Sequence, residues 1–248
     1  MSARRFMINS RAIREGYASF DGDLFNHMVR VLRLKTGDNV LLIDEIGVEY
    51  FSTINQVAKE WVAVKIDSAN LAAVSNTTVM PITICQALPK GDKIDFILQK
   101  GAELGAHSFR LFGGRRSVAK IREDQQENKL ERWNRITAEA ARQCGRSDIP
   151  TVTWNKSAIE AADQSTQEIR LLLWEGEREK PLKVALSVDE KPASVIVAIG
   201  PEGGFDPHEV SCFVQQGFQP VSLGPRILRT ETAGIAILSI IQYKWGDM

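Results

Sequence analysis

VIVAIGPEGGF, at residues 195–205, is an apolar run that stops at a loop rich in glycine and proline. LGPRILRTET, at residues 223–232, repeats this arrangement, and a long apolar segment follows it. A continuous apolar run of this length is typical of a buried parallel strand. Because glycine lets the backbone approach a ligand closely, the two loops together predict a backbone-lined pocket for a flat, nucleoside-like ligand.

Length and composition predict a globular protein with one large domain or two smaller ones. The chain has 248 residues, of which 44% are hydrophobic and 25% charged, and its formal net charge is zero. Any contact with RNA must therefore come from local basic clusters. Three cysteines far apart in the sequence indicate neither a disulfide framework nor a zinc site and fit a reducing cytoplasm. We expect no secretory signal and no membrane span.

The patterning divides the chain at residue 70. In residues 1–70, short β-branched runs at 40–44, 47–57 and 61–66 and a short helix at 26–34 predict a small barrel or sandwich, and residues 67–78 read as a linker. In residues 71–248, strands expected at 79–87, 108–112, 170–174 and 195–199 alternate with helices expected at 92–105, 123–144, from 206, and at 231–243. This alternation predicts an α/β fold with a parallel sheet. The last helix is apolar nearly all round, so it must be buried in the core or against a second subunit.

Several common catalytic motifs are absent from the sequence. It contains no G-x-G-x-x-G, no phosphate-binding P-loop, no G-x-S-x-G and no histidines at metal-ligand spacing. Dinucleotide chemistry, phosphoryl transfer, serine-triad hydrolysis and zinc chemistry are therefore disfavoured. Taken alone, a single G-P-E-G-G is better explained by an ordinary turn between strand and helix. A second loop that holds Arg226, Arg229 and Glu231 among apolar residues favours a binding site.

The chain resembles the ribosomal RNA small-subunit methyltransferase E family. The resemblance rests on GPEGGF at 200–205, LGPRILRTETA at 223–233, QKGAELG at 99–105, EAARQCGR at 139–146, RRF at 4–6 and HMVRVLRLKTGD at 27–38. It implies a PUA-like β-barrel over residues 1–70 and a SPOUT-type α/β domain with a deep trefoil knot over residues 71–248. It also implies a cytoplasmic homodimer that transfers a methyl group from S-adenosylmethionine to N3 of a uridine in 16S ribosomal RNA, without a metal.

The same resemblance, joined to the loop pattern, assigns candidate residues to the site. The cofactor would contact the loops that follow three strands: Trp174, Glu175, Ile199, Gly200, Pro201, Glu202, Gly203, Gly204, Leu223, Gly224, Ile227, Leu228, Arg229, Thr230, Thr232 and Ala233. The guanidinium of Arg229 would stabilise negative charge on a uracil carbonyl. Glu231 or Glu202 would take the N3 proton. The alternative is that either carboxylate only caps a helix or orients Arg229.

Basic residues in both domains are candidates for phosphate contacts, which fix the register of a bound RNA. They are Arg4, Arg5, Arg30, Arg33, Lys100, Arg115, Arg116, Arg142 and Arg146. A solvated charged face is the plainer interpretation, and a salt bridge explains Lys100 with Glu103 equally well. Since the net charge is zero, the predicted partner is a folded ribonucleoprotein, such as an assembled small ribosomal subunit, recognised by its shape.

Three alternative functions stay open at this point. The acceptor can be a ribose or another base, because the cofactor loops do not encode it. The chain can be an RNA-binding relative without catalysis, although the intact Arg229 and the uninterrupted loop 200–204 count against this. An enzyme acting on a small nucleotide is disfavoured because phosphate-binding loops are missing and a barrel is appended.

Overall fold

The computed structural model divides into two compact units, Met1–Thr78 with Ala141–Ile149 and Val79–Ala140 with Pro150–Met248. We call them the N-terminal and the C-terminal unit. The structure describes the whole chain except residues 1–3, 45–47, 71–79, 147 and 188–189. The N-terminal unit thus includes residues 141–149, which the sequence analysis assigned to the second domain.

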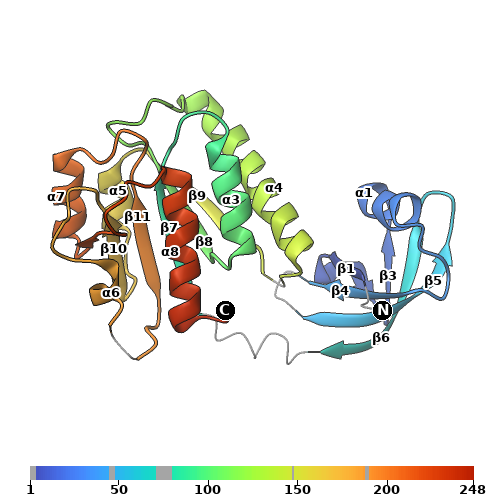
Figure 1. Cartoon of the computed structure of the whole chain (residues 1–248). Coiled ribbons are helices and arrows are strands. Elements are labelled where there is room, and N and C mark those ends of the chain that lie inside the picture. Colours follow the sequence, from blue (N-terminus) through green and yellow to red (C-terminus); the bar gives the residue numbers. More distant parts are fainter. Residues whose placement is uncertain (1–3, 45–47, 71–79, 147, 188–189) are drawn as a thin grey trace. The chain divides into compact units, whose positions relative to one another are not determined.

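The N-terminal unit contains a six-stranded sheet with the strand order β1-β4-β5-β6-β3-β2 (Figure 1). Its strands are β1 (Arg4–Met7), β2 (Ile13–Arg14), β3 (Tyr17–Phe20), β4 (Asn39–Ile43), β5 (Glu49–Val57) and β6 (Val62–Asn70), with the short helices η1 (Ser10–Ala12) and α1 (Gly22–Phe25). All neighbours pair antiparallel except β1 with β4. Val40, Leu42 and Val64 are among the side chains that form the core of this unit. Val40 and Leu42 lie two positions apart because successive side chains of a strand point to opposite faces of the sheet.

Two expectations for this unit are wrong. The segment 26–34 is not one ordinary helix: α1 runs into a π-helix, η2 (Asn26–Val31), and Arg33 after it has a φ of 55°. A π-helical turn and a non-glycine residue in the left-handed region are both uncommon, and patterning does not reveal them. The predicted linker 67–78 begins too early, because β6 continues to Asn70 and pairs with β5. The remainder of that linker, 71–78, lies outside the described residues.

The C-terminal unit contains a six-stranded sheet with the order β12-β10-β11-β7-β8-β9, and all of its pairs are parallel. The strands are β7 (Ile82–Ala87), β8 (Ser108–Phe112), β9 (Thr151–Asn155), β10 (Ile169–Leu173), β11 (Val195–Ile199) and β12 (Gln219–Val221). The helices are α3 (Lys93–Glu103), η3 (Glu123–Gln125), α4 (Gln126–Cys144), α5 (Ala158–Asp163), α6 (Leu182–Ala185), α7 (Pro207–Gln215) and α8 (Thr230–Trp245). The predicted α/β class with a parallel sheet is confirmed.

Helices cover both faces of this sheet. Inward residues of α3, α4, α6 and α8 pack on one face, where Ile84, Val197 and Leu171 form the core. Those of α5 and α7 pack on the other face around Cys85 and Ala198. Figure 1 shows the sheet between these two layers. Burial on both faces explains why its central strands read as continuous apolar runs.

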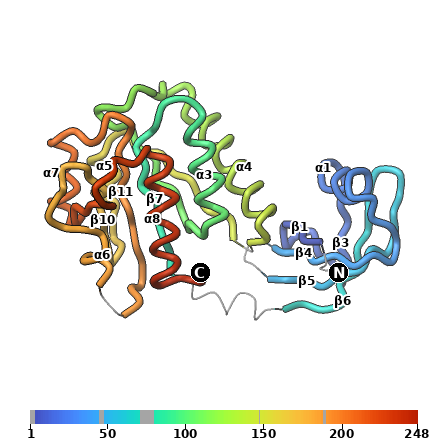
Figure 2. Tube along the Cα trace, viewed as in Figure 1, coloured from blue at the N-terminus to red at the C-terminus, as the bar shows by residue number. Residues whose placement is uncertain are grey.

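Helix α8 is the nearly all-apolar helix of the sequence, and it packs on α3 and β11 (Figure 2). Its side chains Ile237, Leu238 and Ile241 are buried in the core, whereas Ile240 and Tyr243 are exposed. Helix α7 begins where the sequence predicts, with a capping box in which Asp206 and Glu209 satisfy each other's backbone N–H groups.

Candidate active site

The carboxyl ends of β10, β11 and β12 lie side by side at one edge of the sheet, because these strands are neighbours and parallel. The loops that carry the predicted cofactor residues leave from these ends. The N–H group of Trp174, after β10, donates to the carbonyl of Val221, the last residue of β12, at 3.2 Å. In open α/β sheets, ligands bind outside the carboxyl ends of the strands.

The loop after β11 needs its glycines for two different reasons. Gly204 has a φ of 68° and donates its N–H to the carbonyl of Pro201 at 2.9 Å, which closes a tight turn. A Cβ on Gly204 would lie 2.1 Å from Oε1 of Glu175, so the carboxylate after β10 packs directly over this turn. A Cβ on Gly200 would lie 3.1 Å from the ring of Phe205. The structure therefore brings Glu175 together with the loop 200–204, as the sequence analysis expected.

A buried polar network joins this loop to the start of α8. Gln86, at the end of β7, is fully buried, and its Nε2 donates to Ala87 O at 2.8 Å and to Thr230 Oγ1 at 2.9 Å. The Thr230 hydroxyl donates in turn to Gly200 O at 2.7 Å. The sequence analysis missed Gln86, although a glutamine inside the apolar run 82–88 was a usable signal.

Lys93, the first residue of α3, bridges the two candidate bases. Its Nζ lies 2.8 Å from Glu202 Oε1 and 3.6 Å from Glu231 Oε2. Burial raises the pKa of Glu202, but hydrogen bonds from Lys93 and from backbone N–H groups, including that of Lys90, outweigh it and lower the pKa below its ordinary value. The hydrogen bond to Glu202 raises the pKa of Lys93. Glu231 Oε2 is buried and accepts no hydrogen bond from any described residue.

Arg229 occupies the N-cap position of α8 and is exposed. Its guanidinium makes no hydrogen bond or ion pair with the described residues, so it is free to bind a ligand. Two residues away, Glu231 lies in the first turn of the same helix. The other predicted cofactor contacts span a range of exposure: Ile199, Pro201 and Ala233 are buried, Leu223 and Leu228 half-buried, and Gly203, Gly224, Ile227 and Thr232 exposed.

Three basic residues predicted to bind RNA are engaged within the C-terminal unit. Arg116 donates to Gly203 O at 3.2 Å, and the backbone N–H of Arg115 donates to the buried carboxylate of Glu209 at 2.8 Å. Both arginines therefore hold the segment that contains the glycine loop. Lys100 forms an ion pair of 2.8 Å with Glu103 on the same helix, which is the alternative that the sequence left open.

In the N-terminal unit, two predicted RNA-contacting arginines donate to backbone carbonyls. Arg4 donates to Leu32 O, and Arg5 donates to Gly145 O beyond the end of α4, each at 2.7 Å. Basic groups that follow the last turn of a helix satisfy its free carbonyls. The remaining candidates are Arg30, which lies over the Phe25 ring, Arg146, which pairs with Asp148, and the exposed Arg33 and Arg142.

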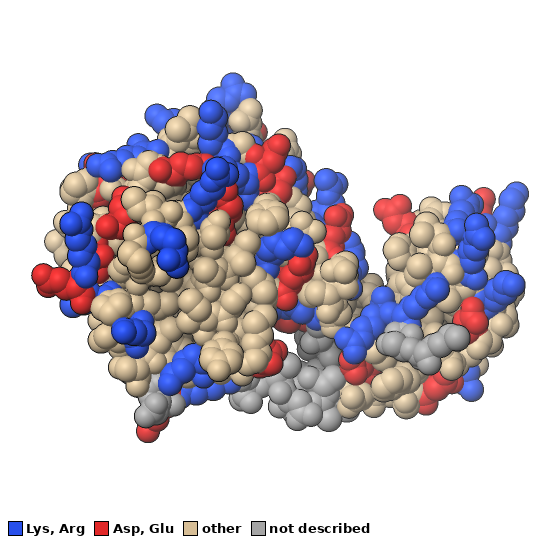
Figure 3. All heavy atoms as spheres, in the orientation of Figure 1, with Lys and Arg blue, Asp and Glu red and all other residues tan. Residues whose placement is uncertain are grey.

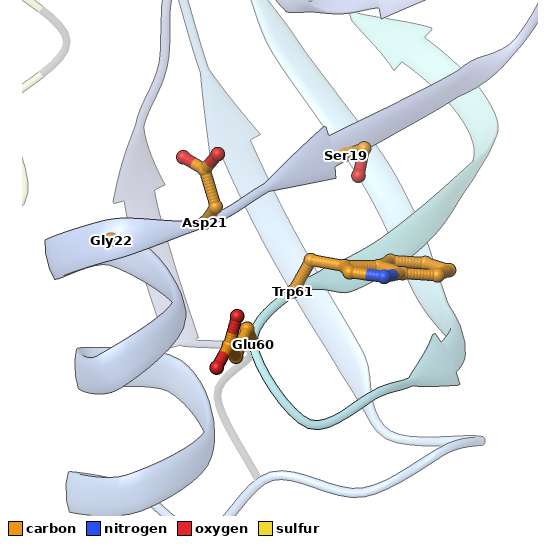
Figure 4. Close-up of a pocket in the computed structure, with 5 residues that line it drawn as sticks. All are labelled: Ser19, Asp21, Gly22, Glu60 and Trp61. Atoms are coloured by element: carbon orange, nitrogen blue, oxygen red, sulfur yellow. The ribbon is translucent and has the colours of Figure 1, made fainter.

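Two hollows lie on the N-terminal unit. One, of about 720 Å³, is lined by Ser19, Asp21, Gly22, Glu60 and Trp61 (Figure 4). Its two carboxylates would repel phosphate. The other, of about 490 Å³, is lined by Val29, Arg33, Leu34, Lys35, Thr36 and Val57 and suits an RNA backbone better, because it combines two cations with a hydroxyl.

Within the described part of the chain, no three His, Cys, Asp or Glu side chains gather where they could hold a metal ion. The described helices likewise include none whose length and hydropathy would let it span a membrane.

Comparison with known proteins relates both units to RNA methyltransferases. A family model described as an RNA methyltransferase domain matches residues 76–242, and one described as an RNA methyltransferase PUA domain matches residues 20–67. The ribosomal RNA small subunit methyltransferase E of Bacillus subtilis is 34% identical over 91% of this chain and 90% of its own length. That of Synechocystis sp. is 32% identical over 96% of this chain and 77% of its own length.

Two solved structures are similar over nearly the whole chain. A ribosomal RNA small subunit methyltransferase E from Neisseria gonorrhoeae, bound to S-adenosyl methionine, has a TM-score of 0.82 at 27% identity and covers 100% of both chains. A Legionella pneumophila protein in complex with the cofactor SAM has a TM-score of 0.85 at 29% identity and covers 98% of both chains. The predicted PUA-like and methyltransferase folds are confirmed, and the chain belongs to the ribosomal RNA small subunit methyltransferase E family.

Proposed function

We propose that this protein transfers a methyl group from S-adenosylmethionine to N3 of a uridine in 16S ribosomal RNA. Membership of the family supports ribosomal RNA of the small subunit as the substrate and S-adenosylmethionine as the cofactor. The observation that carries the proposal is the free guanidinium of Arg229 beside two glycine-rich loops at the carboxyl edge of the sheet. A cytoplasmic location follows from such a substrate.

The residues at this edge fit the cofactor. The carboxylates of Glu175 and Glu231 lie at this edge, that of Glu175 directly over the glycine turn. Their negative charges suit a ligand that carries a positive charge on sulfur and an amino group. The loop 200–204 leaves from the carboxyl end of β11, and its glycines let Phe205, Arg116 and Glu175 pack closely against its backbone. Loops after β10, β11 and β12 would hold the cofactor.

When bound, S-adenosylmethionine supplies a methyl group on a positively charged sulfur, so no metal is needed to activate it. The chain's own task is to hold the acceptor nitrogen in line with that methyl group, which is catalysis by proximity. Uracil N3 carries a proton, and the nitrogen becomes a good nucleophile only when that proton is removed. Arg229 would hydrogen-bond a neighbouring carbonyl oxygen and stabilise the negative charge that develops there.

Of the two candidate bases, the contacts favour Glu231. Glu202 accepts hydrogen bonds from Lys93 and from the N–H of Lys90, and these lower its pKa and occupy its lone pairs. Glu231 lies on the same helical turn as Arg229 and is held less tightly, because its Oε2 pairs with Lys93 only at 3.6 Å and accepts no hydrogen bond from the described residues. A base must lie within hydrogen-bond reach of the proton it removes, and Glu231 satisfies this if Arg229 holds the uracil.

RNA contacts would come from the residues that the structure leaves free. Arg33 and Lys35 line one hollow, and Arg142 is exposed on the last turn of α4. Arg4, Arg5 and Arg116 donate to backbone carbonyls and Arg115 pairs with Asp206, so these four would act mainly through those contacts. An assembled small subunit stays the predicted substrate, because the zero net charge disfavours indiscriminate RNA binding.

A homodimer through α8 is part of the proposal. Ile227, Ile240 and Tyr243 are exposed on and before this helix, and Phe96 is exposed on α3, which packs against it. Figure 3 shows the surface over α8 as largely uncharged, with charged side chains around it. Contiguous apolar surface of this kind is typical of protein interfaces. The deep trefoil knot also stays a prediction, with which the strand order agrees.

The test is a methylation assay on small ribosomal subunits that lack the modification, with naked 16S RNA in parallel. The protein and labelled S-adenosylmethionine are added, and the RNA is digested to nucleosides for mass spectrometry. We expect N3-methyluridine from the subunits and much less from naked RNA. A methylated ribose or another base would overturn the choice of acceptor, and calorimetry without saturable cofactor binding would overturn the methyltransferase itself.

A further inference from the structure

The geometry of the network around Gln86 determines which atom donates and which accepts in each of its hydrogen bonds. The Thr230 hydroxyl has one proton, and the carbonyl of Gly200 at 2.7 Å can only accept it. Thr230 Oγ1 must then accept from Gln86, and the carbonyl of Ala87 must also accept from Gln86. The amide nitrogen therefore faces both groups, and the two ends of the carboxamide cannot be exchanged.

This orientation leaves Gln86 Oε1 buried and without a hydrogen bond from any described residue. A leucine or methionine of similar size would fill the position without burying an unpaired acceptor. The glutamine therefore weakens the core, and its place at the carboxyl end of β7, opposite Ile199 of β11, puts it directly behind the glycine loop. Buried polar groups that are only partly satisfied occur where function requires them.

We infer that Gln86 is a positioning residue of the cofactor site. Through Thr230 it holds the loop after β11 and the start of α8 at a fixed spacing, so that Gly200–Gly204 on one side and Arg229 on the other face the same ligand. The inference rests on the proposed function and deepens it. Gln86 does not touch the methyl group or the acceptor nitrogen. It acts through the two segments that do the binding.

The structure offers a matched control at the other end of the same strand. Thr83 on β7 shares a hydrogen bond of 2.9 Å with Ser108 on β8, and Thr83 is buried like Thr230. Thr83→Val and Thr230→Val each remove one hydroxyl from a buried hydrogen bond and add one methyl group. They differ in that only Thr230 connects to the glycine loop.

The experiment measures the dissociation constant of S-adenosylmethionine by calorimetry, the thermal midpoint, and amide hydrogen exchange. The full-length variants are Gln86→Leu, Thr230→Val, the double variant, Thr230→Ser and Thr83→Val. We expect Gln86→Leu and Thr230→Val each to weaken cofactor binding about tenfold, because each breaks one hydrogen bond and the loss of one hydrogen bond changes a dissociation constant by about that factor. The double variant should bind the cofactor no more weakly than either single variant, because both substitutions interrupt the same chain of hydrogen bonds from Gln86 through Thr230 to Gly200.

Thr230→Ser keeps the hydroxyl and should recover most of the affinity that Thr230→Val loses. Thr83→Val should lower the thermal midpoint without changing the affinity. Amides of residues 200–205 should exchange faster in Thr230→Val than in Thr83→Val. The inference is overturned if Thr230→Val lowers stability as Thr83→Val does but binds the cofactor normally, or if the effects of Gln86→Leu and Thr230→Val add. Failure of the unchanged protein to bind the cofactor would instead overturn the proposed function.

Discussion

Lys93 Nζ lies 2.8 Å from Glu202 Oε1, although 109 residues separate the two in the chain. This ion pair connects the first turn of α3 to the glycine loop. A second ion pair, between Lys93 and Glu231, connects α8 to the same lysine. Three segments of the candidate site therefore share one positive charge.

Replacing Lys93 with methionine should destabilise the protein in a pH-dependent way. The pKa of Glu202 is lowered in the folded state. Its contribution to the free energy of unfolding is therefore present above the ordinary carboxyl pKa and is lost as the pH falls through the lower folded pKa. The pKa of Lys93 is raised, so its contribution is present below the ordinary lysine pKa and is lost at still higher pH. Unfolding by urea should show the Lys93→Met defect near pH 7 and little defect near pH 3.

Lys100→Met is the matched control for that series, because Lys100 pairs with Glu103 on the same helix and does not reach the loop. Each variant removes one ion pair and should lose stability, but only Lys93→Met should also weaken S-adenosylmethionine binding. Equal cofactor affinity in the two variants would mean that the Lys93 pair does not shape the site.

Arg229→Ala should lower turnover by roughly 10²–10³-fold, which is the usual effect of removing one group that stabilises developing negative charge. Cofactor affinity should change little, since the guanidinium makes no contact that holds the loops. Single-turnover methylation and calorimetry check the two parts. Arg226→Ala, in the same exposed loop, serves as the control. Parallel loss of cofactor binding and turnover in Arg229→Ala would show that Arg229 is structural.

Glu231→Gln and Glu202→Gln should differ. If Glu231 takes the N3 proton, its amide variant should be slower by about 10²–10⁴-fold, and raising the pH should recover part of the rate. Glu202→Gln loses only a partly exposed ion pair, so we expect a reduction of about fivefold or less. Initial rates from pH 6 to pH 10 give both comparisons. The opposite ranking would assign the base to Glu202.

Tyr243→Lys should shift the protein from dimer to monomer. The Tyr243 side chain is 81% exposed on α8, where a charge would face the apolar surface of a second copy. Sedimentation velocity measures the change. Val118→Lys alters a residue that is 70% exposed on a loop of the same unit and should leave the assembly unchanged. A monomeric parent protein would refute the proposed interface.

The three cysteines should react at very different rates with iodoacetamide at pH 8. Burial raises the pKa of the Cys85 thiol to about 12, so it carries almost no thiolate in the folded protein. Cys144 is exposed and Cys212 is half-buried. Peptide mapping should find label on Cys144 first and none on Cys85 until urea unfolds the chain. Early labelling of Cys85 would contradict the central position of β7.

The elements with strong local signals were the ones that the sequence predicted best. Strands β8 and β11 have the expected bounds, and Asp206 with Glu209 marks the start of α7 through its capping box. Strand β9 and helix α5 were missed because both are short: β9 spans only 151–155, although TVTWN alternates polar and apolar residues, and α5 spans only 158–163. Short elements owe their structure to the neighbours they pack against, which a local pattern does not contain.

The candidate site divides in the same way. The glycine loop and Arg229 could be proposed from the sequence because their residue types are unusual beside apolar runs. Lys93 as a bridge and Gln86 as an anchor could not, since each acts through contacts with residues more than 100 positions away. The contacts of Arg115 with Asp206 and of Arg116 with Gly203 were hidden for the same reason, because a basic residue looks free until the fold supplies a carboxylate or a carbonyl.

The hydrogen bond from Gln86 to Thr230 joins positions that are 144 residues apart. A ribosome that is still synthesising this chain has therefore released β7 long before the residue that completes the site is made. Until then the nascent protein lacks Arg229 and Thr230, on which the proposed cofactor site depends. We therefore expect activity toward ribosomal particles to begin only after translation of the chain has passed Thr230.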